Sequence, residues 1–285
     1  MKNKKTSKEE IEVVKANLKF FKAKAVDYNK EEPSYRPENI QRVKKILKNI
    51  IKNKTNSNIL DIGCGTGFII DLVKKMNSNV YGIDISPEML QMVNHQNHKI
   101  GLVIGDTAKI PIQKNFFDLC TAYGFLHHLY DITPTIKEAY RCLKKGGIFY
   151  SDQDPNYYFW QNTKNFEIND TKNKILKNEI EHVNDPTVGY QIKNMKSLKI
   201  AGRKTILKAE FQKTERGGFK EEEIKKIFKK VGFRKISFHY EWYLAEGYVK
   251  HQRASKEDKI INEYLRECLP FTRNLFKYVR IIAEK

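Results

Sequence analysis

The sequence predicts an α/β fold, with a mostly parallel sheet wound so that helices cover both of its faces. The clearest observation lies at residues 58–73, where a short apolar run passes through a glycine-rich turn into a second apolar run. Three later apolar runs, at residues 80–84, 101–105 and 116–123, have the length of buried strands. Strands of a parallel sheet that is covered on both faces have this near-continuous apolar character.

Composition places the chain among globular proteins. Its 285 residues, 40% of them hydrophobic, suffice for one elaborated domain or for a domain with a cap. No apolar run approaches the roughly 18 residues of a membrane span, and the Lys-rich start lacks the apolar region of a secretory signal, so we expect a cytoplasmic protein. The cysteines form no C-x-x-C pair, which argues against a disulfide framework and a zinc site; they are Cys64, Cys120, Cys142 and Cys268.

The formal net charge of +19 is concentrated in the flanking residues 1–54 and 155–285, whereas residues 55–154 are close to neutral. Basic flanks of this kind suit an acidic substrate, a membrane surface or nucleic acid. Lys far outnumbers Arg, and the sequence contains no Arg cluster. Because nucleic-acid recognition tends to use Arg forks and exposed aromatic residues, RNA binding is kept as an alternative and is not favoured.

Residues 1–54 are predicted to contain two helices that cover the site as a lid segment. Ser7 and Glu10 make a capping box, and apolar residues recur at helical spacing through residues 8–26. We expect this stripe to pack across the core rather than on a membrane, because its polar face mixes Glu with Lys. A second helix is entered through Pro37 at its first turn. The stripe of the first helix consists of Ile11, Val14, Leu18, Phe21 and Ala25.

The glycine-rich turn, Gly63-Cys64-Gly65-Thr66-Gly67, joins a predicted strand at residues 58–62 to a predicted helix at residues 68–73. Glycines at alternate positions let the backbone adopt positive φ and leave room for a ligand to touch the main chain. The dinucleotide fingerprint G-x-G-x-x-G requires glycine where this chain has Phe68, which disfavours a nicotinamide cofactor.

Polar side chains follow the later strands at the sheet edge where ligands bind to parallel sheets. Asp84 ends the second predicted strand, and a carboxylate at this place can accept hydrogen bonds from both hydroxyls of a ribose. Asp106 and Thr107 follow the third strand, and His127 and His128 follow the fourth. We therefore expect one shared site at this edge.

The second half of the chain is predicted to leave the common core and return to it. Lys144-Lys145-Gly146-Gly147 is predicted to turn before a fifth strand at residues 148–151. Residues 155–212 open with aromatic side chains and are expected to form an inserted substrate lid. Residues 213–285 supply the C-terminal part of the core sheet. Their predicted elements are a helix at 224–231, a strand at 233–244 and a final strand at 278–282.

The segment Leu60-Asp61-Ile62-Gly63-Cys64-Gly65-Thr66-Gly67 resembles the first motif of class I S-adenosylmethionine-dependent methyltransferases. Further segments follow in the order of that family, which extends the resemblance from about Ile59 to Ser151. The His-His-Leu sequence after the fourth strand resembles the small-molecule branch, which includes the quinone-biosynthesis methyltransferases. The resemblance implies a doubly wound, Rossmann-like core at residues 55–154, in a seven-stranded sheet whose last strand is antiparallel.

The same resemblance implies S-adenosyl-L-methionine as the cofactor and assigns roles to site residues. Asp61 would interact with the amino group of the cofactor through water, and Gly63 and Gly65 would admit its methionine portion. Asp84 would hold the ribose and Asp106 the adenine. The other cofactor-binding candidates are Thr107, Ile85, Tyr123 and, from the lid segment, Tyr28 and Arg36 with Tyr35, for which surface packing is the alternative.

For the chemistry we expect direct displacement, in which a nucleophile of the acceptor attacks the sulfonium methyl group and no metal is required. His127 or His128 is the candidate general base for a hydroxyl nucleophile, because the pKa of a histidine lies near neutrality. The alternative is that one or both cap the following helix or support the loop. Asp152 and Asp154, after the fifth strand, are candidates for shaping the substrate pocket.

The favoured function is therefore methyl transfer to a small-molecule acceptor. The first alternative is an RNA (tRNA) methyltransferase that uses the basic flanks. The second is a module that binds S-adenosylmethionine without catalysing transfer.

Overall fold

The chain is described by a computed structural model, and part of the predicted lid, Phe166 included, lies outside the described residues. No helix within the described ranges is long and apolar enough to span a bilayer. The described residues are 7–51, 56–76, 78–95, 98–164, 173–185, 187, 201–251 and 255–285.

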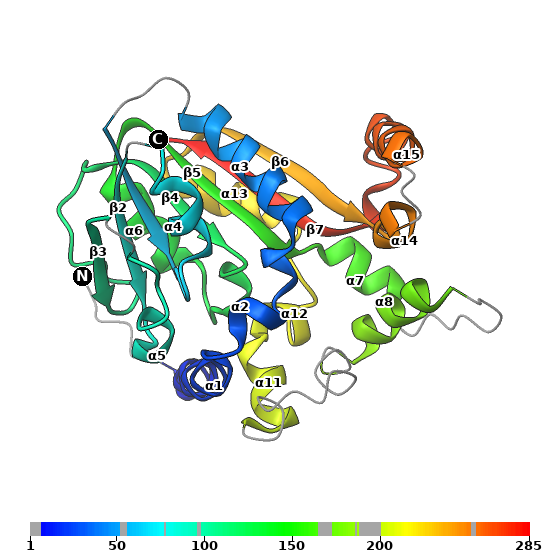
Figure 1. The fold of residues 1–285 in the computed structure, drawn as a ribbon, viewed down its shortest axis with the longest axis horizontal. Coiled ribbons are helices and arrows are strands. Elements are labelled where there is room, and N and C mark those ends of the chain that lie inside the picture. Colours follow the sequence, from blue (N-terminus) through cyan, green and yellow to red (C-terminus); the bar gives the residue numbers. More distant parts are fainter. Residues whose placement is uncertain are drawn as a thin grey trace.

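The centre of the fold is a seven-stranded sheet with the strand order β3-β2-β1-β4-β5-β7-β6 (Figure 1). β7 runs antiparallel to β5 and β6, and the other neighbouring strands are parallel. The predicted fold class is confirmed, including the antiparallel last strand. The strands are β1 (Ser57–Ile62), β2 (Ser78–Asp84), β3 (Ile100–Ile104), β4 (Phe117–Tyr123), β5 (Leu143–Pro155), β6 (Arg234–Tyr243) and β7 (Phe276–Glu284).

The strand order reverses between β1 and β4. From β1 the chain moves outward to β2 and β3, and it then crosses back to pair β4 with the other side of β1. Ligands bind to open α/β sheets in the crevice at such a switch point, outside the carboxyl ends of the strands. The loops that leave β1, β2, β3 and β4 all emerge at this edge.

Helices cover both faces of the sheet, each over its own apolar cluster. On one face α3 (Pro37–Ile51) and α4 (Phe68–Val73) contribute buried residues such as Leu47 and Ile70. On the other face α6 (Thr133–Cys142) and α13 (Glu221–Val231) contribute Ile136 and Phe228. This two-sided burial explains why the central strands are apolar along their whole length.

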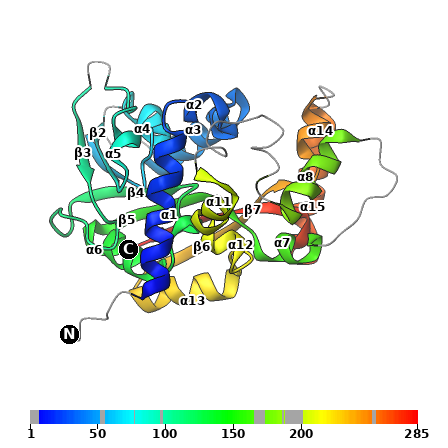
Figure 2. The same ribbon diagram turned by 90° about the horizontal axis from the view of Figure 1, so that it is seen from below.

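α1 (Lys8–Lys24) crosses the carboxyl edge of the sheet beside α11 (Arg203–Ala209), as the view from below shows (Figure 2). Ala16 and Phe20 of α1 are buried in one apolar cluster with Ile206 and Ala209 of α11. Two segments far apart in the sequence are therefore joined over the site.

The predicted apolar stripe of this helix is partly wrong. Ile11 and Val14 are 43% and 38% exposed, whereas Val13 and Phe20 are 1% exposed. The reason is that the helix does not lie flat on a core. One side packs against α11, and the side toward the sheet faces an open cavity.

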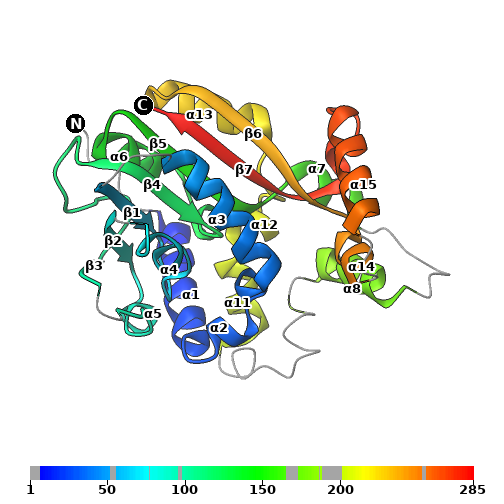
Figure 3. The same ribbon diagram turned by 45° about the horizontal axis from the view of Figure 1, so that its top comes forward.

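A further group of helices lies beyond the edge of the sheet, near the ends of β6 and β7 (Figure 3). α7 (Tyr157–Thr163) contacts α8 (Lys174–Asn184), and α8 contacts α14 (Glu246–His251). α14 in turn contacts α15 (Ser255–Glu267). The predicted lid, residues 155–212, is therefore divided between two parts of the molecule. α7 and α8 belong to this outer group, whereas α11 lies beside α1 at the carboxyl edge of the sheet. The other α-helices of the described residues are α2 (Tyr28–Glu31), α5 (Pro87–Leu90) and α12 (Phe211–Thr214).

The turn predicted at residues 144–147 is an irregularity within β5. Leu143 pairs with Phe117, and the next pair joins Ile148 to Leu119, so more residues of β5 than of β4 lie between the two pairs. The extra residues loop out, and Lys285 holds them, since its carbonyl accepts from the Gly146 N–H at 2.9 Å. The predicted turn is present, but the strand starts before it.

Candidate functional site

The glycine-rich turn forms the floor of the site at the carboxyl end of β1. Gly63 and Gly65 have φ angles of +67° and +51°, in the left-handed region that favours glycine. A Cβ atom at Gly63 would lie 2.0 Å from the ring of Phe125, so a side chain there has no space. The Gly63 N–H donates to the carbonyl of Ile83 at 2.8 Å, which ties the turn to the end of β2.

Asp84 connects the turn to the next loop. Its Oδ2 accepts from the Gly65 N–H at 2.8 Å, and its Oδ1 accepts from the Ser86 N–H at 2.9 Å. Burial raises the pKa of Asp84, and the amide donors oppose that rise. Each carboxylate oxygen keeps a lone pair for a further donor. The side chain is thus held in one orientation at the strand end where a ribose contact was predicted.

Asp61 lies behind the turn. Its Oδ1 accepts from the Thr121 hydroxyl at 2.7 Å, and the residue is 2% exposed. Burial raises its pKa to about 7, and the charge of Asp84 adds to the rise. Its predicted contact with the cofactor remains a prediction, because its side chain is buried between β1 and β4 and lines neither of the two cavities described below.

A cavity of about 140 Å³ opens over the turn at the switch point; we call it the strand-end cavity. Most of the residues predicted to bind the cofactor line it, although they come from five separate loops and helices. Arg36, Asp61 and His127 do not. Those that do are Tyr28, Gly63, Gly65, Asp84, Ile85, Asp106, Thr107 and Tyr123, joined by His128 from the catalytic prediction.

Hydrogen bonds hold the side chains that follow β3 and the tyrosine that ends β4. Asp106 accepts from the Ala108 N–H at 2.8 Å, and the hydroxyls of Thr107 and Thr135 pair at 2.9 Å. The Tyr123 hydroxyl accepts from the side-chain amide of Asn39 at 2.8 Å. The last contact holds α3 against the end of β4.

The segment after α1 closes over the turn through Tyr35, a predicted lid residue, and Asn29, which the sequence did not single out. Thr66 donates to Asn29 at 2.5 Å, so its hydroxyl oxygen is left to accept from the Tyr35 hydroxyl at 2.8 Å. Tyr35 lines the strand-end cavity, as proposed for a lid residue, while Arg36 does not. This chain of hydrogen bonds fastens the N-terminal segment to the glycine-rich turn.

Asn17 is a site residue that sequence reasoning missed. Its amide nitrogen donates to the carbonyls of Val13 at 3.0 Å and His128 at 2.9 Å. Its Oδ1 is buried, has no hydrogen-bond partner among the described residues and belongs to a side chain that lines the strand-end cavity. In the sequence, Asn17 is a polar residue next to apolar positions of α1. This pattern does not show which face of the helix Asn17 occupies, so it indicates a site residue only weakly.

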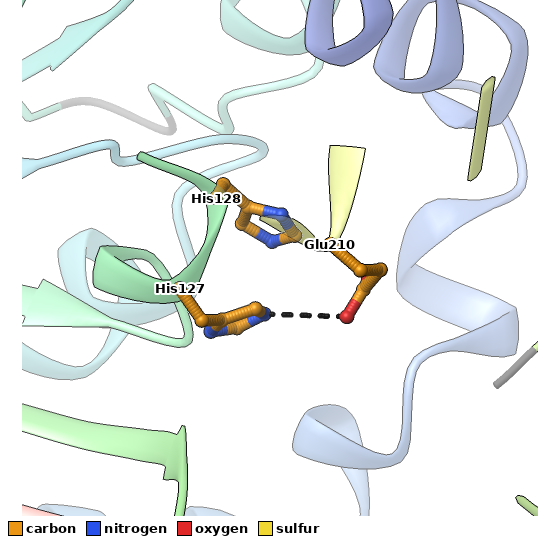
Figure 4. A group of neighbouring side chains, drawn as sticks. All are labelled: His127, His128 and Glu210. Atoms are coloured by element: carbon orange, nitrogen blue, oxygen red, sulfur yellow. Dashed lines mark ion pairs between the residues drawn. The ribbon is translucent and has the colours of Figure 1, made fainter. Parts of the chain in front are cut away.

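The two histidines lie in a short 3-10 turn, Leu126–His128, directly after β4 (Figure 4). The Nδ1 of His128 lies 2.8 Å from the carbonyl of Ala209, which can only accept, so this nitrogen carries the proton. The Nδ1 of His127 lies 2.9 Å from Oδ1 of Asp154. Burial lowers the pKa of both rings to about 4, so both are neutral at neutral pH.

A second cavity, of about 210 Å³, lies beside the first; we call it the histidine cavity. His127 and His182 line it, together with Glu210 and Lys213 from the segment after α11. The two cavities adjoin, since they share six lining residues: Phe21, Tyr28, Ser34, Tyr123, Gly124 and His128. A molecule in one cavity would therefore meet a molecule in the other beside His128.

Glu210 is the buried carboxylate of the histidine cavity. Burial raises its pKa, but the ammonium groups of Lys213 and Lys24 outweigh burial and hold the pKa well below its usual range. Its Oε2 lies 3.4 Å from Nζ of Lys213 and 3.7 Å from Nε2 of His127. The cavity thus contains an ionised carboxylate next to neutral imidazoles.

Comparison with known proteins gives a family match over the core. The family described as "Methyltransferase domain" matches residues 60–151. Demethylmenaquinone methyltransferase of Staphylococcus saprophyticus is 37% identical over 101 residues, which cover 33% of this chain and 43% of the relative. Cycloartenol-C-24-methyltransferase of Arabidopsis thaliana is 28% identical over 186 residues, which cover 62% of this chain and 53% of the relative. The chain thus spans about half the length of these curated relatives.

Solved structures share the fold at low sequence identity. Phosphoethanolamine N-methyltransferase 2 of Haemonchus contortus, in complex with S-adenosyl-L-methionine, aligns with a TM-score of 0.53 at 14% identity, covering 92% of this chain and 59% of that one. An S-adenosylmethionine-dependent methyltransferase of Archaeoglobus fulgidus aligns with a TM-score of 0.52 at 19% identity, covering 91% and 98%.

The family match and the switch-point architecture agree with each other. The predicted methyltransferase class and its cofactor are confirmed at the level of this domain. Residues 60–151 match a methyltransferase domain, and the chain shares its fold with a methyltransferase solved in complex with S-adenosyl-L-methionine.

Proposed function

We propose that the chain is an enzyme that transfers a methyl group from S-adenosyl-L-methionine to a small-molecule acceptor. The observation that carries the proposal is the pair of adjoining cavities at the switch point of the sheet. The strand-end cavity has the glycine-rich turn and two strand-end carboxylates, and the histidine cavity lies directly beside it. One cavity would take the cofactor and the other the acceptor.

The strand-end cavity fits the cofactor in the polar groups that it offers. Gly63 lines the cavity, and its missing Cβ atom lets the ring of Phe125 pack against the main chain beside it. Asp84 is oriented by two amide donors, and we assign it to the ribose hydroxyls. We assign Asp106 and Thr107 to the adenine. The unpartnered Oδ1 of Asn17 is a further acceptor for a donor group of the cofactor.

The mechanism that we infer is direct displacement. S-adenosyl-L-methionine supplies a methyl group on a sulfonium, which needs only an aligned nucleophile. The protein holds the acceptor against the methyl group, and such alignment contributes up to about 7–11 kcal/mol in well-oriented systems. His128 is neutral, donates through Nδ1 and keeps Nε2 as an acceptor, so it can take a proton from an acceptor hydroxyl.

The segments outside the core would complete the site by excluding water. We assign residues 1–54 to a lid over the strand-end cavity, since α1 lines it through Val14 and Phe21. From residues 155–212, His182 and Glu210 line the histidine cavity. Residues 213–285 supply β6 and β7 to the core sheet.

The relatives support a small molecule as the acceptor. Their names refer to demethylmenaquinone, cycloartenol and phosphoethanolamine, which are all small molecules and chemically unlike one another. The histidine cavity combines the aromatic rings of Phe20 and Tyr278 with polar side chains. We therefore infer a small acceptor with an apolar body and a polar reacting group.

The decisive experiment measures cofactor binding and methyl transfer together. Calorimetry with S-adenosylhomocysteine should show binding to the full chain, and Asp84→Ala should weaken it more than tenfold, because the carboxylate would hold the ribose. Asp118→Ala is the matched control, since Asp118 is a part-buried aspartate at the opposite end of β4, bonded to the Asn58 N–H at 2.9 Å.

Three outcomes separate the alternatives. Transfer of labelled methyl groups to small hydroxylated acceptors supports the proposal. Methylation of tRNA with an affinity that falls steeply with salt would replace it with the RNA alternative. Binding without transfer to any acceptor would point to a non-catalytic module, and unchanged affinity in Asp84→Ala would remove the ribose assignment.

A further inference from the structure

The histidine cavity contains a cluster with the composition of a metal site. His127, His128 and Glu210 each offer one ligand atom, and these atoms all lie within 4.8 Å of one another (Figure 4). Two segments far apart in the sequence bring them together, namely the turn after β4 and the junction between α11 and α12. Among the described residues, no other trio of His, Cys, Asp or Glu meets this criterion.

Both imidazoles are oriented in the way that metal-binding histidines usually are. The Nδ1 of His128 is held by the carbonyl of Ala209, and the Nδ1 of His127 by the carboxyl group of Asp154. Metal-ligating histidines typically engage one ring nitrogen with a carbonyl or carboxylate, which fixes the ring and leaves the other nitrogen for the ion. Nε2 of His128 is therefore unprotonated, and Nε2 of His127 is unprotonated when its Nδ1 carries the ring proton.

The electrostatics of the cluster favour a cation. When Nδ1 of His127 donates to Asp154, the unprotonated Nε2 faces Oε2 of Glu210 at 3.7 Å. Two acceptors face each other there, and a positive charge between them would relieve the repulsion. The lining of the cavity also has more carboxylates than ammonium groups: Glu31, Glu32 and Glu210 against Lys24 and Lys213.

Lys213 is the nearest competing cation. Its Nζ lies 3.4 Å from Oε2 of Glu210, but it also lies 3.2 Å from Nε2 of His182 and 4.8 Å from the ring centre of Trp160. These contacts hold the ammonium group on the side of Glu210 that faces α8 and α7. The side that faces His127 remains for another positive charge.

We propose that His127, His128 and Glu210 bind a divalent transition-metal ion such as Zn²⁺. Imidazole nitrogens suit zinc and related ions better than magnesium or calcium, which prefer oxygen ligands. Three protein ligands with an open position are the arrangement of catalytic zinc sites. Because metal–ligand bonds are about 2.0–2.2 Å long, binding requires a small inward movement, which the flexible side chain of Glu210 can supply.

The metal site would refine the function, and this step rests on the proposed methyl transfer. With the ion bound, Nε2 of His128 would be a ligand, so the ion would take over from His128 the task of activating the acceptor hydroxyl. An open coordination position in the histidine cavity would take a hydroxyl or carbonyl oxygen of the acceptor. Two kinds of acceptor would fit this arrangement. In one the oxygen bound to the metal is itself methylated, and in the other it lies next to the atom that is methylated. The proposal departs from the expectation, made from the sequence alone, that no metal takes part.

The test starts from the full chain, stripped of metal with a chelator and then dialysed against Zn²⁺. Elemental analysis should find one equivalent of zinc per chain. His127→Ala and Glu210→Gln should each weaken zinc binding by at least about tenfold in competition with a chromophoric chelator. His239→Ala should bind zinc like the wild type, because His239 is a partly buried histidine that lines neither cavity.

A second measurement needs no variant. A crystal of the wild-type chain soaked with Zn²⁺ should show anomalous density between the three side chains. Absence of that density, or undiminished zinc binding in both variants, would overturn the proposal in favour of a proton shared between His127 and Asp154. Calorimetry with S-adenosylhomocysteine on the metal-free chain tests the proposed function separately. The metal site can therefore be wrong while the cofactor still binds, and the two results are distinguishable.

Discussion

Single residues decide how the two cavities are connected, and Asn17 is the clearest case. It lies on α1, yet it hydrogen-bonds the backbone of His128 at the end of the 3-10 turn. The same side chain lines the strand-end cavity with an unpartnered oxygen. One amide therefore links the lid helix, the histidine turn and the cavity assigned to the cofactor.

Asn17→Ala should weaken binding of S-adenosylhomocysteine by roughly two- to tenfold, because one buried hydrogen bond is worth about 0.5–1.5 kcal/mol. Calorimetry measures the effect. Lys15→Ala, at an exposed position of the same helix, is the control and should bind normally. Equal affinities in both variants would exclude Asn17 from the cofactor site.

Asp61 illustrates a residue whose burial has a consequence for stability. Its pKa in the folded chain is about 7, compared with 3.8 when unperturbed. Between these pH values the folded state binds a proton that the unfolded state has lost. The free energy of unfolding contributed by this group therefore decreases as pH rises through this range.

Asp61→Asn should abolish that contribution, since an amide does not titrate and can still accept from Thr121. Urea unfolding of both proteins at about pH 4.5 and 7.5 should show a variant that gains stability relative to wild type at the higher pH. Each unit of pKa difference corresponds to about 1.4 kcal/mol. If the two pH profiles run parallel, the carboxyl group is not held in the apolar surroundings that the structure gives it.

At the scale of elements, the site depends on α1 being held by α11 rather than by the sheet. The two helices share the buried cluster around Phe20 and Ile206, and they contact each other more than either contacts any strand. α1, which we propose as part of a lid over the strand-end cavity, is therefore anchored by a helix that lies roughly two hundred residues later in the chain.

Ile206→Ala should loosen this lid. Ile206 is fully buried and lines neither cavity, and truncating a buried isoleucine to alanine typically costs about 2–5 kcal/mol. Trypsin should cut within α1 faster than in the wild type, and S-adenosylhomocysteine should bind more weakly. Lys204→Ala, exposed on α11, is the control. Unchanged cleavage of α1 in a folded variant would mean that α11 does not anchor it.

At the scale of the whole molecule, the strand order creates the site. The reversal between β1 and β4 leaves a crevice at the carboxyl edge, and the chain uses both of its flanks to cover that crevice. A ligand there contacts loops from several strands and α1 at once. Its binding should therefore stabilise the entire fold.

S-adenosylhomocysteine at about one hundred times its dissociation constant should add about 2.7 kcal/mol to the free energy of unfolding. For a domain of this size, that corresponds to a rise of roughly 5 °C in the thermal midpoint. Thermal unfolding followed by circular dichroism measures it. The thermal midpoint of Asp84→Ala should rise less at the same ligand concentration. An equal rise would mean that the ligand binds away from Asp84.

The sequence alone determined the core of this protein and most of one cavity. The glycine-rich turn, Asp84 and Asp106 follow strands directly, and local rules fix where a turn and a strand end lie. The carboxyl ends of parallel strands meet at one edge, so the order of residues is enough to assign these side chains to a common site. The near-neutral net charge of residues 55–154 and the apolar runs within them also predicted that these residues form the core.

The tertiary structure alone decided what surrounds that core. No local pattern shows that Glu210 lies beside His127, that α11 anchors α1, or that Asn17 faces a cavity, because these pairings join segments far apart in the chain. The same apolar spacing on α1 fits more than one face, and only packing against α11 selects the buried one. Short-range geometry thus fixed the loops of the strand-end cavity, whereas long-range packing chose the residues of the histidine cavity.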